Sequence, residues 1–339
     1  MSFLSLAAFP LSVLLAVVLV PLAVKLAWIT AYLDHPEARK LHTSATALLG
    51  GAAVFVSALV VWGSLLPWIR HGQPDAEAWS LAAGAAIALG IGLWDDRFGM
   101  RPSVKLIGQA ASAAILISAA GIPDSRLPAP IAGVIALVML IGLMNAVNFL
   151  DNMNGMVGGL APIALVGFAW TSLARGATGL GTAQLALAGA CVGFLPSNFP
   201  RARIFLGDAG SLLLGYSLGA SALLAMRAAP AGWGRIGPAI ILGYPVFDLI
   251  FVVITRVRDG RPIYQGGKDH SNHRLASLVG RQEPTVGLLW LVGAALCVSG
   301  IAVMHLDHAA PALALAGAWC LAMLASGWRL AAVPFAHRD

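Results

Sequence analysis

The amino-acid sequence predicts an all-α integral membrane protein that crosses the bilayer about eleven times, or ten by a stricter count. Two observations support this fold class. Hydrophobic residues make up 59% of the 339 residues and charged residues only 11%, with a mean hydropathy of +0.83, more apolar than a soluble core requires. Apolar stretches of about 17 to 25 residues also recur along the chain, each long enough to cross the hydrocarbon as a helix. We therefore expect one membrane-embedded unit over residues 1–339.

The predicted spans follow one another with short connections. The first is apolar from Phe3 to Thr30 and lacks a small-residue cleavage site, so we interpret it as a span, although an uncleaved signal anchor would look the same. The eleven spans lie at about 3 to 30, 46 to 68, 78 to 94, 104 to 121, 129 to 147, 156 to 174, 180 to 196, 209 to 227, 236 to 255, 285 to 305 and 310 to 332. An odd number of spans places the two termini on opposite sides.

Basic residues predict the orientation of these spans. If the amino terminus is outside, sixteen of the 21 Lys and Arg residues fall on the inner side, in the inner connections, at the inner ends of spans or in the carboxyl tail. Such residues favour the cytoplasmic side, so we look for function on that face. The same asymmetry explains the net charge of +6 without nucleic acid binding. The three cysteines, Cys191, Cys297 and Cys320, lie in apolar stretches and are interpreted as packing residues.

Four aspartates lie at inner ends of the predicted spans: Asp95, Asp96, Asp151 and Asp208. A carboxylate at the edge of the hydrocarbon costs a few kcal/mol unless it is paired, hydrated or metal-bound, so several on one face indicate a cation. No Cys or His cluster accompanies them, which favours Mg²⁺ or Mn²⁺ and phosphate chemistry. Singly they have simpler explanations, because Asp95 and Asp96 could form a solvated turn and Asp208 could cap a helix. Their coincidence on one side favours a site.

The longest inner loop, residues 256–284, contains a basic segment with two histidines. Lys268, His270, His273 and Arg274 lie within a stretch of seven residues in this loop. One interpretation is a positive loop that touches anionic lipid. The alternative is that the histidines and Arg274 present cationic donors to a diphosphate. The same two alternatives apply to the segment that contains Arg39, Lys40 and His42.

Five sequence segments together carry a resemblance to a known family. They are Asp34-His-Pro-Glu-Ala-Arg-Lys-Leu-His42 with Gly50-Gly51, Gly92-Leu-Trp-Asp-Asp-Arg-Phe98, Asn145-Ala-Val-Asn-Phe-Leu-Asp-Asn152, Asn198 with Phe205-Leu-Gly-Asp-Ala-Gly-Ser211, and Lys268 to Leu275. In this order they resemble the polyprenyl-phosphate N-acetylhexosamine-1-phosphate transferases, glycosyltransferase family 4, and more distantly the phospho-N-acetylmuramoyl-pentapeptide transferases. The resemblance covers nearly the whole chain. It implies ten or eleven helices around a cleft at the cytoplasmic face of a bacterial inner membrane.

The resemblance also implies roles for individual residues. Asp208 would bind Mg²⁺, Asp95 and Asp96 would lie where the acceptor lipid phosphate reacts, and Asp151 would belong to the same acidic cluster. The catalytic set is completed by His270 and His273, which with Arg274 would contact the diphosphate. The expected substrate-binding residues are Arg39, Lys40, His42, Asn148, Asn154, Asn198, Phe205, Lys268 and Arg274. Of these, Asn198 and Phe205 would line the nucleotide site, with Phe205 available to stack on uracil.

Some positions depart from the family pattern. Gly99 stands where relatives often have Asp or Lys, and Asn154 stands where they commonly have Asp. Ser271 and Asn272 separate the two histidines of a run that is usually denser. These differences affect the expected substrate contacts, whereas the four aspartates are all present.

The implied reaction is attack by a polyprenyl phosphate oxygen on the β-phosphorus of a UDP-N-acetylhexosamine, with N-acetylglucosamine as the default sugar. The products are a lipid diphosphate sugar, which initiates a cell-envelope glycan, and UMP. The implied partners are the UDP-sugar, polyprenyl phosphate and membrane lipids, with no nucleic acid, and the sequence leaves a homodimer open. It also does not rank Asp95 and Asp96 as the residue that handles the nucleophile.

Two other functions would also use acidic residues in a membrane protein. A prenyltransferase needs a second carboxylate three or four residues from each aspartate, where this chain has Gly99 and Leu212. A transporter would carry its acids near mid-span at a repeat interface. Only Asp248 has such a position, and we interpret it as a structural support for the cleft.

Overall fold

A computed structural model describes residues 3–35, 45–69, 75–123, 127–229, 232–263, 267–306 and 308–334. Arg39, Lys40 and His42 lie outside the described residues, so their predicted roles are not tested by it.

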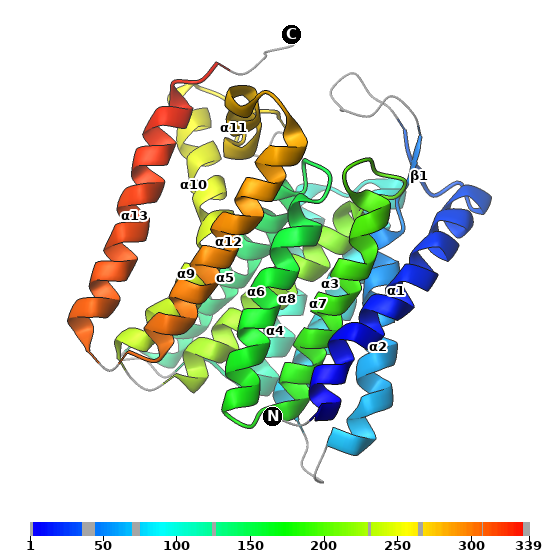
Figure 1. The fold of residues 1–339 in the computed structure, drawn as a ribbon, viewed down its shortest axis with the longest axis horizontal. Coiled ribbons are helices and arrows are strands. Elements are labelled where there is room, and N and C mark those ends of the chain that lie inside the picture. Colours follow the sequence, from blue (N-terminus) through cyan, green and yellow to red (C-terminus); the bar gives the residue numbers. More distant parts are fainter. Residues whose placement is uncertain are drawn as a thin grey trace.

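The structure confirms the all-helical membrane class. The long helices are α1 (Phe3–Ile29), α2 (Gly50–Ile69), α3 (Ala76–Phe98), α4 (Pro102–Ala120), α5 (Ala129–Leu150), α6 (Met156–Ala174), α7 (Thr178–Asn198), α8 (Gly207–Ala228), α12 (Gln282–Met304) and α13 (Ala309–Ala331). Among the described residues these ten are long and apolar enough to cross a membrane, and one bent helix pair raises the count to eleven. The helices alternate in direction (Figure 1), and the connections that contain the predicted site gather at one end with α11 (Ser271–Val279). We call it the α11 end.

The ninth predicted span is not one straight helix, which corrects the expectation for residues 236 to 255. It consists of a 3-10 helix, η1 (Trp233–Ile236), the short α9 (Gly237–Ile241) and α10 (Gly243–Arg258), with a bend of 71° at the break. Pro245 has no N–H to donate to the carbonyl of Ile241, so the helical ladder is interrupted at this point. The break turns α10 toward the loop that leads to α11.

Helix α8 forms the centre of the bundle. Nearly all of its residues are buried, and it packs against α3 and α5. A Cβ atom at Gly215 would lie 2.7 Å from the Cα of Met144, so glycine permits the close approach of α8 to α5. By contrast, α13 lies at the periphery (Figure 1), with only Ala312 and Leu330 buried.

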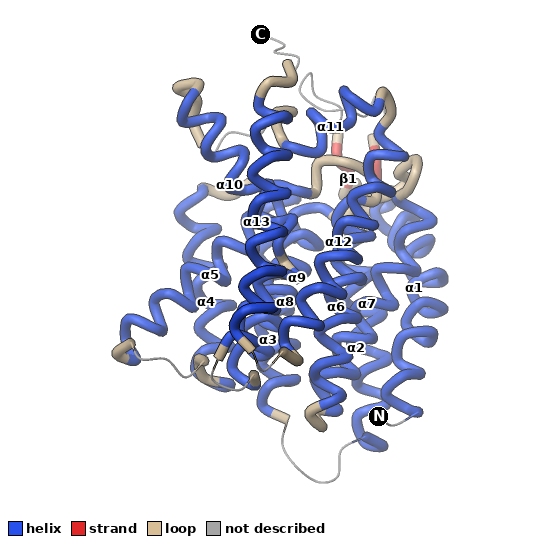
Figure 2. Tube along the Cα trace, turned by 60° about the vertical axis from the view of Figure 1, so that its left-hand side comes forward, coloured by secondary structure: helices blue, strands red, loops and turns tan. Residues whose placement is uncertain are grey.

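A small β-structure organises the loops at the α11 end (Figure 2). Strand β1 (Leu33–Asp34) pairs antiparallel with β2 (Thr46–Ala47), and Ala47 also bridges to Ile204. The Phe205 amide donates to the Ala47 carbonyl at 2.8 Å, and the Gly50 amide donates to the Phe205 carbonyl at 3.1 Å. These bonds hold the start of α8 beside the start of α2.

Candidate functional site

The amino terminus of α8 is capped by a carboxylate from another helix. Asp96, in the last turn of α3, accepts the Asp208 amide on Oδ1 at 2.8 Å and the Ala209 amide on Oδ2 at 3.1 Å. Gly207 precedes them with a φ of +70°, and a Cβ at this position would lie 2.5 Å from Asp96 Oδ2. Glycine is therefore required both by the backbone conformation and by the close approach.

Asp208 lies in the first turn of α8 between an amide and an ammonium group. Its Oδ1 accepts the Asn148 side-chain amide at 2.8 Å, and the same amide donates to Ser211 Oγ at 2.8 Å. Its Oδ2 lies 2.5 Å from Lys105 Nζ, which is also 2.8 Å from Asp95 Oδ2. Lys105 therefore bridges carboxylates of α3 and α8 from its own position on α4.

Asp151 follows α5 and belongs to the same electrostatic environment. Burial, and after it the charge of Asp208, raises the pKa of the Asp151 carboxyl from 3.8 to about 7. The predicted cluster of four aspartates is thus brought to one end of the bundle, and Lys105 is the only cation that ion-pairs with its members among the described residues. Four carboxyl groups therefore surround one ammonium group in this part of the structure.

A second polar cluster surrounds His270, at the start of α11. His270 Nδ1 donates to Asp248 Oδ2 at 2.7 Å, and Asp248 Oδ1 accepts the Ser271 amide at 2.8 Å and the Ser271 hydroxyl at 2.5 Å. Tyr244, also on α10, lies 3.2 Å from the Ser271 hydroxyl. The expectation that Asp248 supports the cleft agrees with these contacts.

Residues 148–152 connect the two clusters. Asn148 contacts Asp208, while the ring of Phe149 lies 6.4 Å from the ring of His270, centroid to centroid. Asn152 Oδ1 accepts the Asn272 side-chain amide at 2.6 Å. One short segment at the end of α5 therefore joins the acidic cluster to the loop that carries the histidines.

His273 differs in charge from the sequence-based expectation. Burial, and after it the neighbouring His270, lowers the pKa of His273 from 6.5 to about 4. The imidazole is therefore neutral near pH 7, and the expected cationic donor is a neutral one.

Comparisons with known proteins identify the family. The model of glycosyl transferase family 4 matches residues 78–226. A probable undecaprenyl-phosphate N-acetylglucosaminyl 1-phosphate transferase of Bacillus subtilis is 30% identical over 304 residues, covering 87% of this chain and 83% of the relative. The chain belongs to glycosyl transferase family 4.

Other members of the family are similar over comparable lengths. A decaprenyl-phosphate N-acetylglucosaminephosphotransferase of Mycobacterium tuberculosis is 31% identical over 294 residues, covering 76% of this chain and 72% of the relative. A phospho-N-acetylmuramoyl-pentapeptide-transferase of Desulforudis audaxviator is 29% identical over 336 residues, covering 87% and 95%. The chain is thus a multi-pass membrane member of the phosphoglycosyltransferases, as the sequence predicts.

The side chain of Arg274, which was expected to contact the diphosphate, binds backbone carbonyls in this structure. Its guanidinium donates to the carbonyls of Leu330, Ala331 and Val333 at 3.2, 3.1 and 3.0 Å. The side chain is buried and lies over the Phe251 ring. These bonds satisfy carbonyls at the carboxyl end of α13, and the expected diphosphate contact of Arg274 stays a prediction.

Asn198 is also engaged by the protein itself. Its Oδ1 accepts the Gly155 amide at 2.7 Å, and its side-chain amide donates to the Ile204 carbonyl at 3.0 Å. The side chain is buried with both functions occupied and braces two loops, and its expected place at the nucleotide site stays a prediction.

The remaining predicted substrate-binding residues are more accessible. Asn154 is half-buried and donates to the Pro200 carbonyl at 3.1 Å, and Phe205 is half-buried beside the start of α8. Lys268 is half-buried two residues before His270. All three lie at the α11 end.

Sequence reasoning missed Lys105 as a site residue and included it only in the inner positive charge. Lys105 lies in the first turn of α4, and one turn farther along α4 Gln109 exchanges side-chain hydrogen bonds with Asn145 of α5. This amide pair aligns the faces of α4 and α5 that carry Lys105 and Asn148. A lone lysine at the start of an apolar stretch was the only sequence signal for this arrangement.

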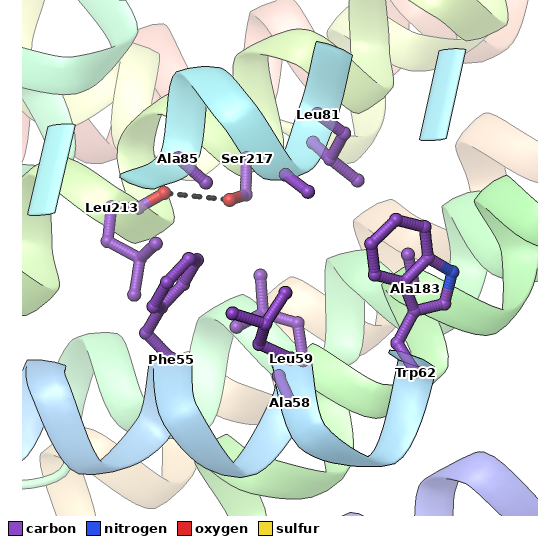
Figure 3. A pocket seen from close by; sticks show the side chains of 11 residues that line it. Phe55, Ala58, Leu59, Trp62, Leu81, Ala85, Ala183, Leu213 and Ser217 are labelled. Carbon is purple, nitrogen blue, oxygen red and sulfur yellow. Dashed lines mark hydrogen bonds between the residues drawn. The ribbon is translucent and has the colours of Figure 1, made fainter. Parts of the chain in front are cut away.

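An apolar cavity of about 40 Å³ lies elsewhere in the bundle, between α2, α3, α7 and α8 (Figure 3). Its lining includes Phe55, Trp62 and Leu81, and the hydroxyl of Ser217 donates within its own helix to the Leu213 carbonyl at 2.8 Å. Ala85 is the lining residue of α3 closest to Asp95 in sequence, about 15 Å along the helix. With no acid or base in its lining, the cavity does not compete as the functional site.

Proposed function

We propose that this chain transfers N-acetylglucosamine 1-phosphate from UDP-N-acetylglucosamine to polyprenyl phosphate, which releases UMP. Relatives that share about 30% identity over most of their length carry this activity in their names. The observation that supports it most directly is the group of carboxylates at the start of α8, with the Lys105 ammonium between two of them. Such an arrangement suits a phosphoryl transfer, which depends mainly on positioning and charge.

The donor atoms at this position suit a hard divalent cation. Among the described residues, no three His, Cys, Asp or Glu side chains form a ready-made metal group. The Lys105 ammonium nevertheless occupies a place between Asp95 and Asp208 where positive charge is stabilised by oxygen atoms. We assign Asp208, with Asp95 and Asp151 nearby, as the residues that would hold Mg²⁺, which keeps substrate oxygens in its shell and neutralises a diphosphate.

The contacts of Asp95 and Asp96 suggest different roles for them. Both oxygens of Asp96 accept amides of α8, so in our proposal this carboxylate orients the helix. Asp95 makes its ion pair through Oδ2 with Lys105, and we assign it to orient the acceptor phosphate or to accept its residual proton. Lys105 would then move to an oxygen of the reacting phosphates, where its positive charge stabilises the transition state.

The donor would lie between the acidic cluster and the α11 loop. In our proposal His270 and His273 would donate to the diphosphate, and Lys268 would add positive charge beside them. We assign the uracil to Phe205, whose backbone is held by Ala47 and Gly50. Asn148 would position Asp208, and Asn154 would replace a carboxylate near the nucleotide by an amide.

The asymmetry of basic residues supports a cytoplasmic location for the α11 end, in a bacterial inner membrane. Loop 256–284 would then lie in the cytoplasm, where UDP-sugars are available.

A donor panel tests the proposed function. Protein reconstituted in nanodiscs with undecaprenyl phosphate is given UDP-N-acetylglucosamine, UDP-N-acetylgalactosamine or UDP-N-acetylmuramoyl-pentapeptide, with EDTA or Mg²⁺. We expect UMP release to require lipid phosphate and Mg²⁺ and to be fastest with UDP-N-acetylglucosamine. Preference for the pentapeptide donor would transfer the protein to the second group of relatives. No UMP release with any donor would refute the proposal.

A further inference from the structure

Asp248 is a fully buried carboxylate on α10, and it is surrounded by hydrogen-bond donors. Its two oxygens accept three hydrogen bonds, from His270 Nδ1, the Ser271 amide and the Ser271 hydroxyl. A charge buried in this way is costly unless donors surround it, and here they do. No ammonium or guanidinium group pairs with Asp248 among the described residues, so His270 is its available counter-charge.

The contact with Asp248 determines which nitrogen of His270 remains available. Nδ1 is used by the carboxylate, and Nε2 makes no hydrogen bond with any residue in the described ranges. The ring lies against Phe149, whose neighbours in sequence reach Asp208 and Asn272. His270 therefore lies at the junction of the two clusters with one nitrogen committed and the other open.

The contacts of the neighbouring aspartate show that this arrangement is specific. Asp269 is also buried, but its oxygens bind Arg256 at 2.8 Å on each side and Arg261 at 2.9 Å. Its charge is balanced by arginines and stabilises the loop. Asp248 has no such partner and contacts the ring of a proposed catalytic residue.

We infer that Asp248 is a positioning residue that holds His270 in the Nδ1–H tautomer and directs Nε2 toward the diphosphate of the donor. This inference rests on the proposed function. When a diphosphate arrives, Nε2 takes a proton from solvent, and the imidazolium is held between the Asp248 carboxylate and a phosphate oxygen. The proton returns to solvent when the product leaves, so no other reactant is needed.

The variant Asp248→Asn should change the tautomer of the His270 ring. The asparagine oxygen can replace Oδ1 and accept from Ser271, which turns the asparagine NH₂ toward His270 Nδ1. Nδ1 must then accept a hydrogen bond, and the proton moves to Nε2. Asp248→Glu keeps the carboxylate and should retain the Nδ1–H tautomer at least in part.

Nitrogen NMR of histidine-labelled protein in nanodiscs tests the tautomer. The chain has eight histidines, and His270→Gln assigns the signal. We expect Nδ1–H in the free protein, protonation of both nitrogens on addition of UDP with Mg²⁺, and a switch to Nε2–H in Asp248→Asn. Other ionisable groups lie on the surrounding segments, namely His273, Lys268, Asp269 and Asp151. The measurement therefore follows the assigned His270 signal instead of the total proton uptake.

Steady-state kinetics provide the second readout. Asp248→Asn should lower kcat about 10-fold or more with little change in the KM for UDP-N-acetylglucosamine, because the charge-assisted bond is lost mainly in the transition state. In a His270→Gln background the same change should cost no further activity. Asp269→Asn is the matched control, which should reduce the folded yield and leave the His270 tautomer unchanged.

An unchanged His270 tautomer in Asp248→Asn, or additive losses in the double variant, would overturn the inference. A protein that releases no UMP from any UDP-sugar would instead refute the proposed function. In that case the tautomer of His270 in the free protein still decides the role of Asp248.

Discussion

The two ends of helices α3 and α8 carry charges in opposite ways. At the end opposite α11, Glu77 lies in the first turn of α3 and Arg227 in the last turn of α8. The Glu77 carboxylate accepts a hydrogen bond from Arg227 at 2.9 Å and also pairs with Arg175. An acid at a helix start and a base at a helix end both agree with the helix dipole. Each charged group of this cluster is paired and lies where its helix favours it.

The α11 end reverses this arrangement. Asp95 and Asp96 lie in the last turn of α3, where the exposed carbonyls disfavour negative charge. The amides of α8 offset this cost at Asp96, and the Lys105 ammonium offsets it at Asp95. The comparison shows that the same two helices carry one carboxylate between two arginines at one end and four carboxyl groups around one ammonium at the other. Residues that oppose local stability in this way are typical of a functional site.

The largest expected effect comes from neutralising one acid at each end. Asp208→Asn should lower the transfer rate about 1,000-fold, because the main group that holds Mg²⁺ is lost. Glu77→Gln is the same chemical change at the opposite end and should leave the rate per folded molecule within about twofold. Transfer assays on both variants at matched folded concentration measure this contrast. A near-normal rate for folded Asp208→Asn would break the comparison.

Removal of the Lys105 ammonium group should sharpen the comparison between the two ends. Lys105→Met should lower kcat about 100-fold and also lower the Mg²⁺ concentration needed for half-maximal activity, because two cations no longer compete for Asp95 and Asp208. Lys105→Arg keeps the charge and serves as the control, with a smaller loss. Mg²⁺ titrations of the transfer rate provide the measurement. A Lys105→Met enzyme with the wild-type Mg²⁺ requirement would show that the ammonium does not share the cation position.

The crowding of carboxyl groups at the α11 end should also appear as a pH dependence of stability. The pKa of Asp151 is raised from 3.8 to about 7, so the folded state binds this proton more tightly than the unfolded state. Its contribution is fully present below about pH 4 and is lost as the pH rises toward about 7. In EDTA, Asp151→Asn should therefore show a flatter decline of Tm between pH 5 and pH 8 than the wild type. Identical slopes would mean that Asp151 does not titrate in this range.

The smallest effect is expected for the contribution of Glu77 to the stability of the protein. Glu77→Gln should reduce the free energy of unfolding by about 1 kcal/mol, the upper range for partly exposed ion pairs. High salt should narrow the difference, because it screens the charges in the wild type. Denaturant titration in detergent at low and high salt measures the loss of unfolding free energy and its dependence on salt. A stability loss that is independent of salt would indicate packing and not charge.

The membrane class and most helices follow from the sequence alone. Each span must satisfy its own backbone hydrogen bonds in hydrocarbon, so length and hydropathy predict α1 to α8, α12 and α13 without knowledge of their neighbours. The same hydropathy could not predict the break between α9 and α10, because an apolar stretch with Pro245 can bend or stay continuous according to what packs around it.

The membrane class, the position of Asp95, Asp96, Asp151 and Asp208 at one end, and the family all follow from the order of the residues. The packing of the helices was needed to show that Lys105 bridges two of these acids, that Asp96 caps α8 and that the Arg274 guanidinium is buried against the end of α13. Lys105 and Asp96 reach Asp208 across 103 and 112 residues. Such contacts depend on how each helix is rotated about its axis and how deep it lies, and hydropathy records neither because lipid accepts any apolar face.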